Sequence, residues 1–175
     1  MKELNRRKFL TLSGASVALL ALAACGSTPS TPVVPTTGKE TKVLEALNLY
    51  REANKWVPYK LDEGLNDLAE EGVKFALGKI ELEQLYQKIA KMNVELGGLY
   101  EEPRFPLGVS EERELTMPYD DDINVMKDAL LALQPADISD SIGQEKVKLV
   151  GIKVFTAKDG KLYWIATGAV SKKAT

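Results

Sequence analysis

Histidine is absent from the 175 residues, and cysteine occurs once, as Cys25. Without histidine the chain cannot form a Ser-His-Asp or Cys-His nucleophile system. The zinc sites that draw on histidine and cysteine are excluded as well. Acid–base chemistry would depend on carboxylates, lysine or tyrosine, and we expect no metal ion or other cofactor. Because one cysteine cannot form an internal disulfide, an ordinary apolar core must hold the folded part together.

The first 25 residues have the composition of a secretory signal. Basic residues that include Arg6 and Arg7 precede an uncharged, almost wholly apolar run at residues 15–24. A charged start, a short apolar run and small residues at a cut site are typical of such signals. The run is shorter than the roughly 20 residues that a membrane-spanning helix needs. The stretch NRRKFL at residues 5–10 also resembles the twin-arginine export signal, with an ordinary basic start as the alternative.

The single cysteine lies at the end of this signal. Leu22, Ala23 and Ala24 lead directly to Cys25, and the four residues resemble a bacterial lipobox. The resemblance implies that the sulfur of Cys25 receives a diacylglycerol, that the chain is cut before it, and that an acyl chain such as palmitate is added to the new amino group. Two or three acyl chains give stable anchoring, at about 0.8 kcal/mol per buried CH2. An ordinary signal peptide with a chance cysteine is the alternative.

A proline-rich segment separates the signal from the rest of the chain. Residues 26–38, GSTPSTPVVPTTG, favour extended polyproline geometry and predict a tether. At about 3.1 Å per residue it reaches roughly 40 Å, and residues 39–175 form the predicted domain. Loss of residues 1–25, with four basic residues and one acidic residue, leaves a net charge near −5, which argues against nucleic acid as a partner. We expect an exported protein that is lipid-anchored at the cell membrane or outer membrane and faces the periplasm or exterior.

Apolar residues recur at helical spacing in four stretches of the domain. We expect helices over residues 39–54 and 61–77, a third along the stripe from Leu82 to Met92, and a fourth from the three aspartates at 120–122 to Leu133. The aspartates suit a helix cap better than a calcium site, because the alternating ligands and the glycine of an EF-hand are missing.

The chain ends in a predicted hairpin, with KVKLVGIKVFTAK and KLYWIATGAV on the two sides of Asp159-Gly160. That dipeptide favours a two-residue turn, which would pair Lys158 with Lys161, Phe155 with Trp164 and Gly151 with Gly168. Both strands are apolar on both faces, so we expect them to be covered on two sides and Trp164 to be buried. Early helices and late, doubly covered strands predict an α+β fold with a sheet between helical layers.

Two patterns in the domain are close to those of a known family. Leu47-Asn48-x-x-Arg51 is followed by Pro58-Tyr59-x-x-Asp62-x-x-Leu65-x-x-x-Ala69, and Val150-Gly151-Ile152-Lys153-Val154 later precedes Gly160-Lys161-Leu162-Tyr163-Trp164. In this order the patterns resemble the CAP superfamily (cysteine-rich secretory, SCP-like proteins), with Tyr59 and Lys153 replacing a leucine and a glycine. The resemblance covers about 50 residues. It implies a three-layer α-β-α sandwich with helices on both faces of a mostly antiparallel sheet.

The middle of the chain departs from that family. Its cleft has two histidines and two acidic residues that can hold a divalent metal. Here Asp137 takes the place of the second histidine, the first has no counterpart, and the acidic pair cannot be assigned. The resemblance therefore implies a shared scaffold without the shared cleft chemistry.

Three functions are compatible with this sequence. The leading one is a non-enzymatic envelope lipoprotein that binds a protein, glycan or lipid or has a structural role. The second is a carboxylate-based hydrolase of cell-wall glycan, with candidates in an acidic region that otherwise faces water: Glu101, Glu102, Glu111, Glu112 and Glu114. The third is a carrier of lipid or another small hydrophobic ligand, with Trp56, Tyr163 and Trp164 in its pocket, although core packing is the usual role of such residues.

Overall fold

The computed structural model describes residues 38–95, 100–101, 103–134, 138 and 141–171. The predicted signal, Cys25, the tether up to residue 37, and Asp137 lie outside these residues. The helices are α1 (Gly38–Ala53), α2 (Glu63–Ala76), α3 (Leu82–Glu95) and α4 (Ile123–Ala132); the strands are β1 (Lys60–Leu61), β2 (Tyr100–Glu101), β3 (Leu149–Thr156) and β4 (Leu162–Ser171). Among the described residues, no helix combines the length and the apolar character that crossing a membrane requires.

The strands form one mixed sheet in the order β1-β3-β4-β2. β3 pairs with β4 in antiparallel fashion over its full length, and β2 adds an antiparallel pair to β4. β1 pairs with the start of β3 in parallel, at Leu149 and Val150. The fold is therefore α+β, as the sequence predicts, and its sheet is dominated by the C-terminal hairpin.

The predicted register of that hairpin is wrong by one residue. Val154 faces Trp164, Phe155 faces Tyr163, and Gly151 faces Thr167. The reason is the turn, which has three residues between Ala157 and Lys161 and not two. The N–H of Gly160 donates to the carbonyl of Ala157 at 3.0 Å, and Gly160 has φ of +79°. A type I turn followed by a glycine in the left-handed region makes a three-residue loop, so the Asp-Gly signal is real but belongs to a longer turn.

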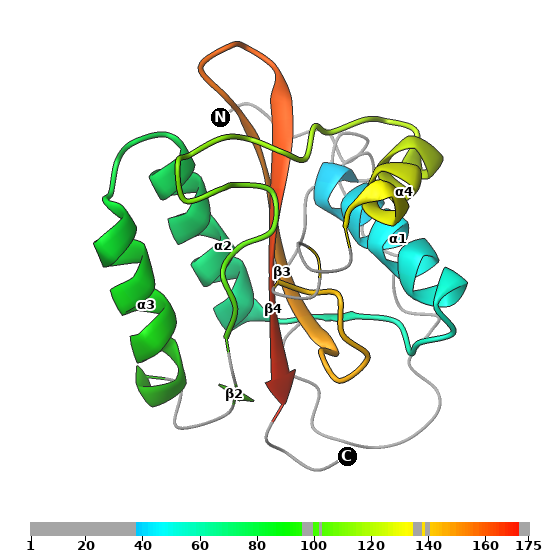
Figure 1. The fold of residues 1–175 in the computed structure, drawn as a ribbon, viewed down its shortest axis with the longest axis horizontal. Coiled ribbons are helices and arrows are strands. Elements are labelled where there is room, and N and C mark those ends of the chain that lie inside the picture. Colours follow the sequence, from blue (N-terminus) through cyan, green and yellow to red (C-terminus); the bar gives the residue numbers. More distant parts are fainter. Residues whose placement is uncertain (1–37, 96–99, 102, 135–137, 139–140, 172–175) are drawn as a thin grey trace, which may run out of the picture. The chain divides into compact units, whose positions relative to one another are not determined.

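Helices lie on both sides of the hairpin, with α2 and α3 on one side and α1 and α4 on the other (Figure 1). Towards α1 and α4 the sheet buries Val150, Ile152, Trp164 and Ala166. Towards α2 and α3 it buries Ile165 and Ala169. Trp164 is 0% exposed, so the prediction that it lies in the core is confirmed.

Helix α2 packs unusually close to the sheet because of one glycine. A Cβ on Gly151 would lie 2.0 Å from the carbonyl carbon of Leu65 and 2.3 Å from the amide nitrogen of Asn66. No side chain fits at that distance. The glycine of the Val150-Gly151 pair in the sequence pattern is therefore required by backbone contact between β3 and α2. Two side-chain bonds fix the same contact: Ile152 N–H donates to Asn66 Oδ1 at 2.8 Å, and Thr167 Oγ1 donates to the carbonyl of Leu65 at 2.9 Å.

The predicted helix ends agree with the observed caps. Asp62 caps α2 by accepting from the N–H of Leu65 at 3.1 Å, and Gly78, with φ of +74°, follows its last turn. Asp122 caps α4 by accepting from the N–H of Asn124 at 2.9 Å. Capping is thus what the structure assigns to this aspartate of the 120–122 cluster.

Candidate functional site

A buried arginine connects the first helix to the segment that precedes β3. Arg51 is 0% exposed. Its guanidinium donates to the carbonyls of Gln144 at 3.2 Å, Glu145 at 3.0 Å and Val147 at 2.8 Å, and Nε donates to the carbonyl of Val57. Carbonyl dipoles thus take the place of a carboxylate partner. A charge satisfied in this way holds chain segments together and offers no group to a ligand.

Two aromatic rings enclose this guanidinium. Its central carbon lies 4.3 Å from the ring centroid of Tyr59 and 5.4 Å from that of Trp56. The hydroxyl of Tyr59 donates to the carbonyl of Ile142 at 2.6 Å. Burial raises the pKa of Tyr59 to about 12, although Arg51 opposes the shift. Burial and the bond to Ile142 favour a neutral, fixed tyrosine that takes part in packing.

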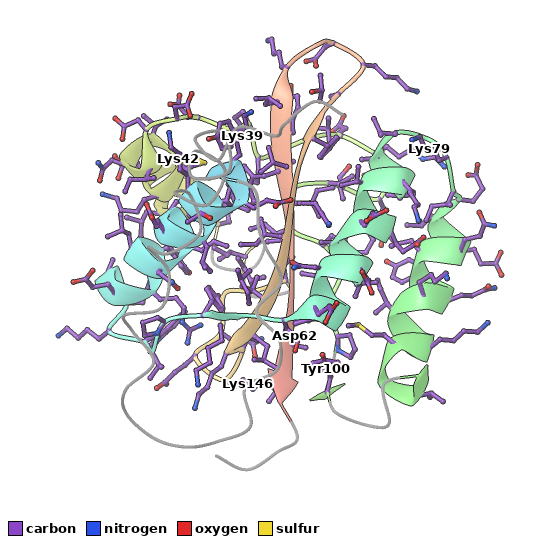
Figure 2. All side chains as sticks on the ribbon, turned by 180° about the vertical axis from the view of Figure 1, so that it is seen from behind. Lys39, Lys42, Asp62, Lys79, Tyr100 and Lys146 are labelled. Carbon is purple, nitrogen blue, oxygen red and sulfur yellow. The ribbon has the colours of Figure 1, made fainter. Side chains whose placement is uncertain are left out.

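The remaining polar residues of the first sequence pattern also bond within the fold. Asn48 Oδ1 accepts from the N–H of Tyr59 at 2.8 Å. Asp62, besides capping α2, accepts from the hydroxyl of Tyr100, and Figure 2 shows the two side chains together at one end of the sheet. Burial, followed by the bond to Asp62, raises the pKa of Tyr100. The pattern is therefore a set of structural contacts that join α1 to the residue before β1, and the start of α2 to β2.

A different region exposes its aromatic residues. Tyr86 of α3 is 43% exposed, and its ring lies 5.7 Å from that of Phe105, in the loop between β2 and α4. The hydroxyl of Tyr86 donates to Glu111, which raises the pKa of Tyr86. These three residues line a hollow of about 480 Å³, here called the Tyr86 hollow; the rest of its lining comes from Pro106, Leu107, Gly108, Val109, Ser110, Thr116, Leu133 and Ser141.

The loop that carries Phe105 is held against β4. Leu107 and Ala166 exchange N–H to carbonyl bonds at 2.8 and 3.0 Å. Gly108, with φ of +104°, lies so close to the carbonyl of Trp164 that a Cβ would be 2.3 Å from its oxygen. Only glycine fits there without a shift of the backbone. The hollow therefore has one wall fixed to the sheet and another formed by α3.

The predicted acidic residues do not converge at this hollow. Glu111 lines it, whereas Glu112 and Glu114 are exposed residues of the same loop and are not among its lining residues. The side chain of Glu101 and all of Glu102 lie outside the described residues. A single carboxylate in the described lining, already bonded to a tyrosine, does not form the flanking pair that glycoside hydrolysis uses.

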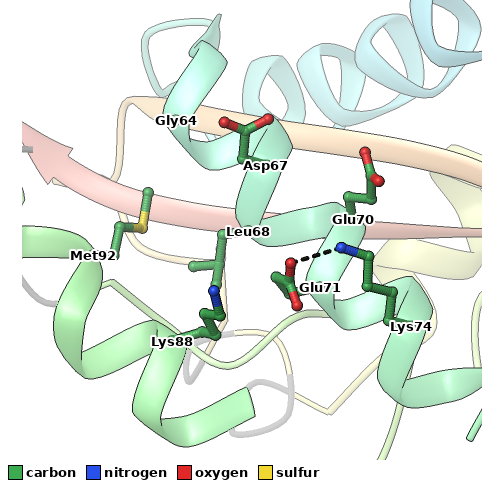
Figure 3. A pocket seen from close by; sticks show the side chains of 8 residues that line it. All are labelled: Gly64, Asp67, Leu68, Glu70, Glu71, Lys74, Lys88 and Met92. Carbon is green, nitrogen blue, oxygen red and sulfur yellow. Dashed lines mark hydrogen bonds and ion pairs between the residues drawn. The ribbon is translucent and has the colours of Figure 1, made fainter. Parts of the chain in front are cut away.

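A second hollow of about 410 Å³ lies between α2 and α3 (Figure 3). Asp67, Glu70 and Glu71 line it from α2. Lys74 donates to Glu71 at 2.8 Å, and Lys153 of β3 lies 3.7 Å from Glu70. Within the described residues, no group of three or more acidic, histidine or cysteine side chains has metal-binding geometry. The acidic face is a solvated, ion-paired helix surface.

The aromatic residues suggested for a carrier pocket do not share one cavity. Trp164 is fully buried. Trp56 lines a hollow of about 530 Å³ with Leu49, Pro58 and Ile123. Tyr163 lines another, next to Gly78 and Arg113, where its hydroxyl donates to Asp159 at 3.0 Å. The interpretation of these three residues as one lipid pocket is therefore wrong.

Sequence reasoning missed both aromatic residues of the Tyr86 hollow. Tyr86 falls on the apolar stripe of α3, which predicts a core position, yet the buried members of that stripe are Leu85 and Met92. Phe105 lies in a proline-containing segment without periodicity. One local signal could have helped: Tyr86 directly follows Leu85, so the two side chains cannot both point to the centre of the apolar face. This places Tyr86 at the border between the apolar face and the polar face of the helix.

Comparison with known proteins adds little to this geometry. No protein-family model matches the chain, and no curated protein matches it. Among solved structures, an outer surface protein from Borrelia burgdorferi is similar at 14% sequence identity and a TM-score of 0.49, over 79% of this chain and 97% of that one.

Proposed function

We propose that the chain is an exported envelope lipoprotein, anchored through Cys25, whose domain is a non-enzymatic binding module for a cell-envelope glycan. The domain is a CAP-like three-layer α-β-α sandwich without the cleft histidines. Support for the layers comes from the two helix pairs on opposite sides of the hairpin. Support for the family comes from the first sequence pattern, in which Asn48 and Arg51 contact Tyr59 and Asp62 bonds to Leu65.

The observation that carries the binding proposal is the composition of the Tyr86 hollow. It joins a half-exposed aromatic face and a second ring to one carboxylate and several hydroxyl groups. Sites of this size with apolar walls and a few fixed polar groups are typical of small-ligand binding. A sugar ring matches this chemistry, because its C–H face packs on an aromatic ring while its hydroxyls bond to carboxylate and hydroxyl oxygens.

Co-sedimentation with isolated peptidoglycan tests this proposal. Tyr86→Ala removes the exposed ring and should weaken binding about tenfold, the factor that corresponds to roughly 1.4 kcal/mol. Val125→Ala is the matched control, because Val125 is also an exposed apolar side chain, 51% exposed, but lies on α4. Equal binding by the wild type and the Tyr86 variant would contradict the proposal. Release of soluble sugar by the wild type, and its loss in Glu111→Gln, would show a hydrolase.

The anchor requires a separate test. Cys25→Ser removes the only sulfur nucleophile that could accept a diacylglycerol. The variant should leave the membrane fraction, or accumulate with its signal uncut, because stable anchoring is proposed to depend on the acyl chains that Cys25 carries. A serine variant that sediments with membranes and has the same mobility as the wild type in a denaturing gel would refute the lipobox interpretation.

A further inference from the structure

The outer edge of β3 is covered over only part of its length. β1 pairs with Leu149 and Val150 and then ends. The N–H of Asp62 donates to the carbonyl of Val150 at 3.0 Å, after which the chain turns into α2. The next N–H of this edge, from Ile152, donates to the side chain of Asn66 at 2.8 Å. Beyond Ile152, no neighbouring strand follows among the described residues.

The direction of the backbone groups on β3 follows from the bonds of β4. Trp164 and Ala166 direct their N–H groups to Met117 and Leu107, away from β3. The alternate residues of β4 therefore bond to β3, and they face Lys153 and Phe155. It follows that Val154 and Thr156 direct their N–H and carbonyl groups to the outer edge. In the described part of the chain, no group bonds to them there.

Such an edge is able to accept one more extended segment. Unpaired N–H and carbonyl groups in a row are a template for pairing, and proteins usually cover or protect them. The open stretch from Ile152 to Thr156 matches a partner of about five residues, since strands rise about 3.3 Å per residue. Thr156 is exposed, and Val154 is half-buried, so the stretch is accessible.

The first described residue of the chain lies near this place. Gly38, the first described residue, lines a hollow of about 690 Å³ together with Val154, Phe155 and Thr156. Figure 2 shows Lys39 and Lys42 on the first turns of α1, and both lysines line the same hollow. The described residues therefore begin next to the open stretch of β3.

The sequence before Gly38 suits a short edge strand. Residues 33–37 are Val-Val-Pro-Thr-Thr, with four β-branched residues. Proline is tolerated in an edge strand where its missing N–H faces solvent. If Pro35 faces away from β3, then Val34 and Thr36 direct their N–H groups towards it. Pro32 would fall on the bonding side, where it lacks a donor, and this ends the pairing at Val33.

We propose that residues Val33–Thr37 pair with the outer edge of β3 at Val154 and Thr156, as an added strand contributed by the chain's own tether. Docking leaves residues 26–32 as the free part between Cys25 and the domain. At about 3.1 Å per residue this part reaches roughly 22 Å, compared with about 40 Å for the whole tether. With the proposed anchor at Cys25, the docked tether therefore keeps the domain closer to the membrane than the free tether would.

Amide hydrogen exchange of the full chain in detergent micelles tests the proposal, with Val154 and Thr156 as reporters. Their N–H groups should be protected in the wild type. Val34→Pro removes a donor that faces β3 and should speed their exchange about tenfold or more. Val33→Pro is the matched control, because the N–H of residue 33 faces away from β3 in the proposed register. In this variant Val154 and Thr156 should exchange at the wild-type rate. The N–H groups of Lys153 and Phe155, which bond to β4, should stay protected in all three proteins.

Three outcomes would overturn the proposal. Fast exchange of Val154 and Thr156 in the wild type would show an open edge. Protection that survives Val34→Pro, or that responds equally to Val33→Pro, would exclude pairing by the tether in this register. Protection that rises with protein concentration would assign the edge to a second copy of the chain.

Discussion

The junction around Arg51 and the hollow around Tyr86 use the same kinds of residue for opposite purposes. At the junction, a buried arginine and Tyr59 bond to main-chain carbonyls. In the hollow, Tyr86 and Glu111 bond to each other at the surface. The family-like sequence pattern lies in the first region and has no member in the second. The comparison teaches that the recognisable residues maintain the scaffold, while the proposed binding site lies where no sequence pattern points.

The largest expected loss of folding stability comes from a substitution in the sheet, which both regions adjoin. Trp164→Ala empties the largest fully buried side-chain position and should lower the free energy of unfolding by about 3 to 5 kcal/mol. Urea unfolding measures this loss. A change within about 0.5 kcal/mol, the range of surface substitutions, would mean that the hairpin is not the centre of the core.

Arg51→Met should have the next largest effect, and it tests the junction alone. Methionine retains the apolar contacts but leaves the carbonyls of Val147, Glu145 and Gln144 without their donor. An unsatisfied buried group costs about 1 to 3 kcal/mol. Only the bond to Val147 is fully buried, and water can reach the half-buried carbonyls of Gln144 and Glu145, so we expect a total loss of about 2 to 4 kcal/mol in urea unfolding. Arg113→Met is the control, since Arg113 is partly exposed and pairs with Glu81 at the surface. If Arg113→Met lowered the free energy of unfolding as much as Arg51→Met, the junction would not be special among the arginine contacts.

Alkaline pH should weaken the junction by a smaller amount. The pKa of Tyr59 is about 12 in the folded protein, above its ordinary value of 10.0, because the ring is buried. The folded state thus holds the proton more tightly than the unfolded chain. The resulting stability is present below pH 10 and is lost as pH rises towards 12, by about 2 to 3 kcal/mol. Tyr59→Phe should lack this loss, so its deficit relative to the wild type should shrink between pH 9 and 11; a constant deficit would contradict this.

Local signals in the sequence were enough to predict most elements of the fold. The apolar spacing of α1 and α2, the capping role of Asp122 and the glycine after α2 each depend on residues within about one or two turns of helix. The burial of Trp164 followed from a strand that is apolar on both faces. None of these predictions required knowledge of a distant contact.

The failures came from one local choice of turn and from contacts between distant segments. The hairpin register depends on whether Gly160 takes a left-handed conformation in a three-residue loop, a choice that the dipeptide alone does not fix. The surroundings of Tyr86 include Phe105, 19 positions away, and Arg51 bonds to carbonyls more than 90 positions away. Such pairs leave no periodic trace, so the candidate site was less predictable than the scaffold.

One matched pair of variants tests the division between the two regions most directly. Tyr59→Phe and Tyr86→Phe delete the same oxygen, one from a buried bond to Ile142 and the other from an exposed bond to Glu111. In urea unfolding at neutral pH, we predict a loss of about 1 to 2 kcal/mol for Tyr59→Phe. For Tyr86→Phe we predict a change within about 0.5 kcal/mol. Equal losses, or a larger loss at Tyr86, would contradict the claim that the junction holds the scaffold and that the hollow does not.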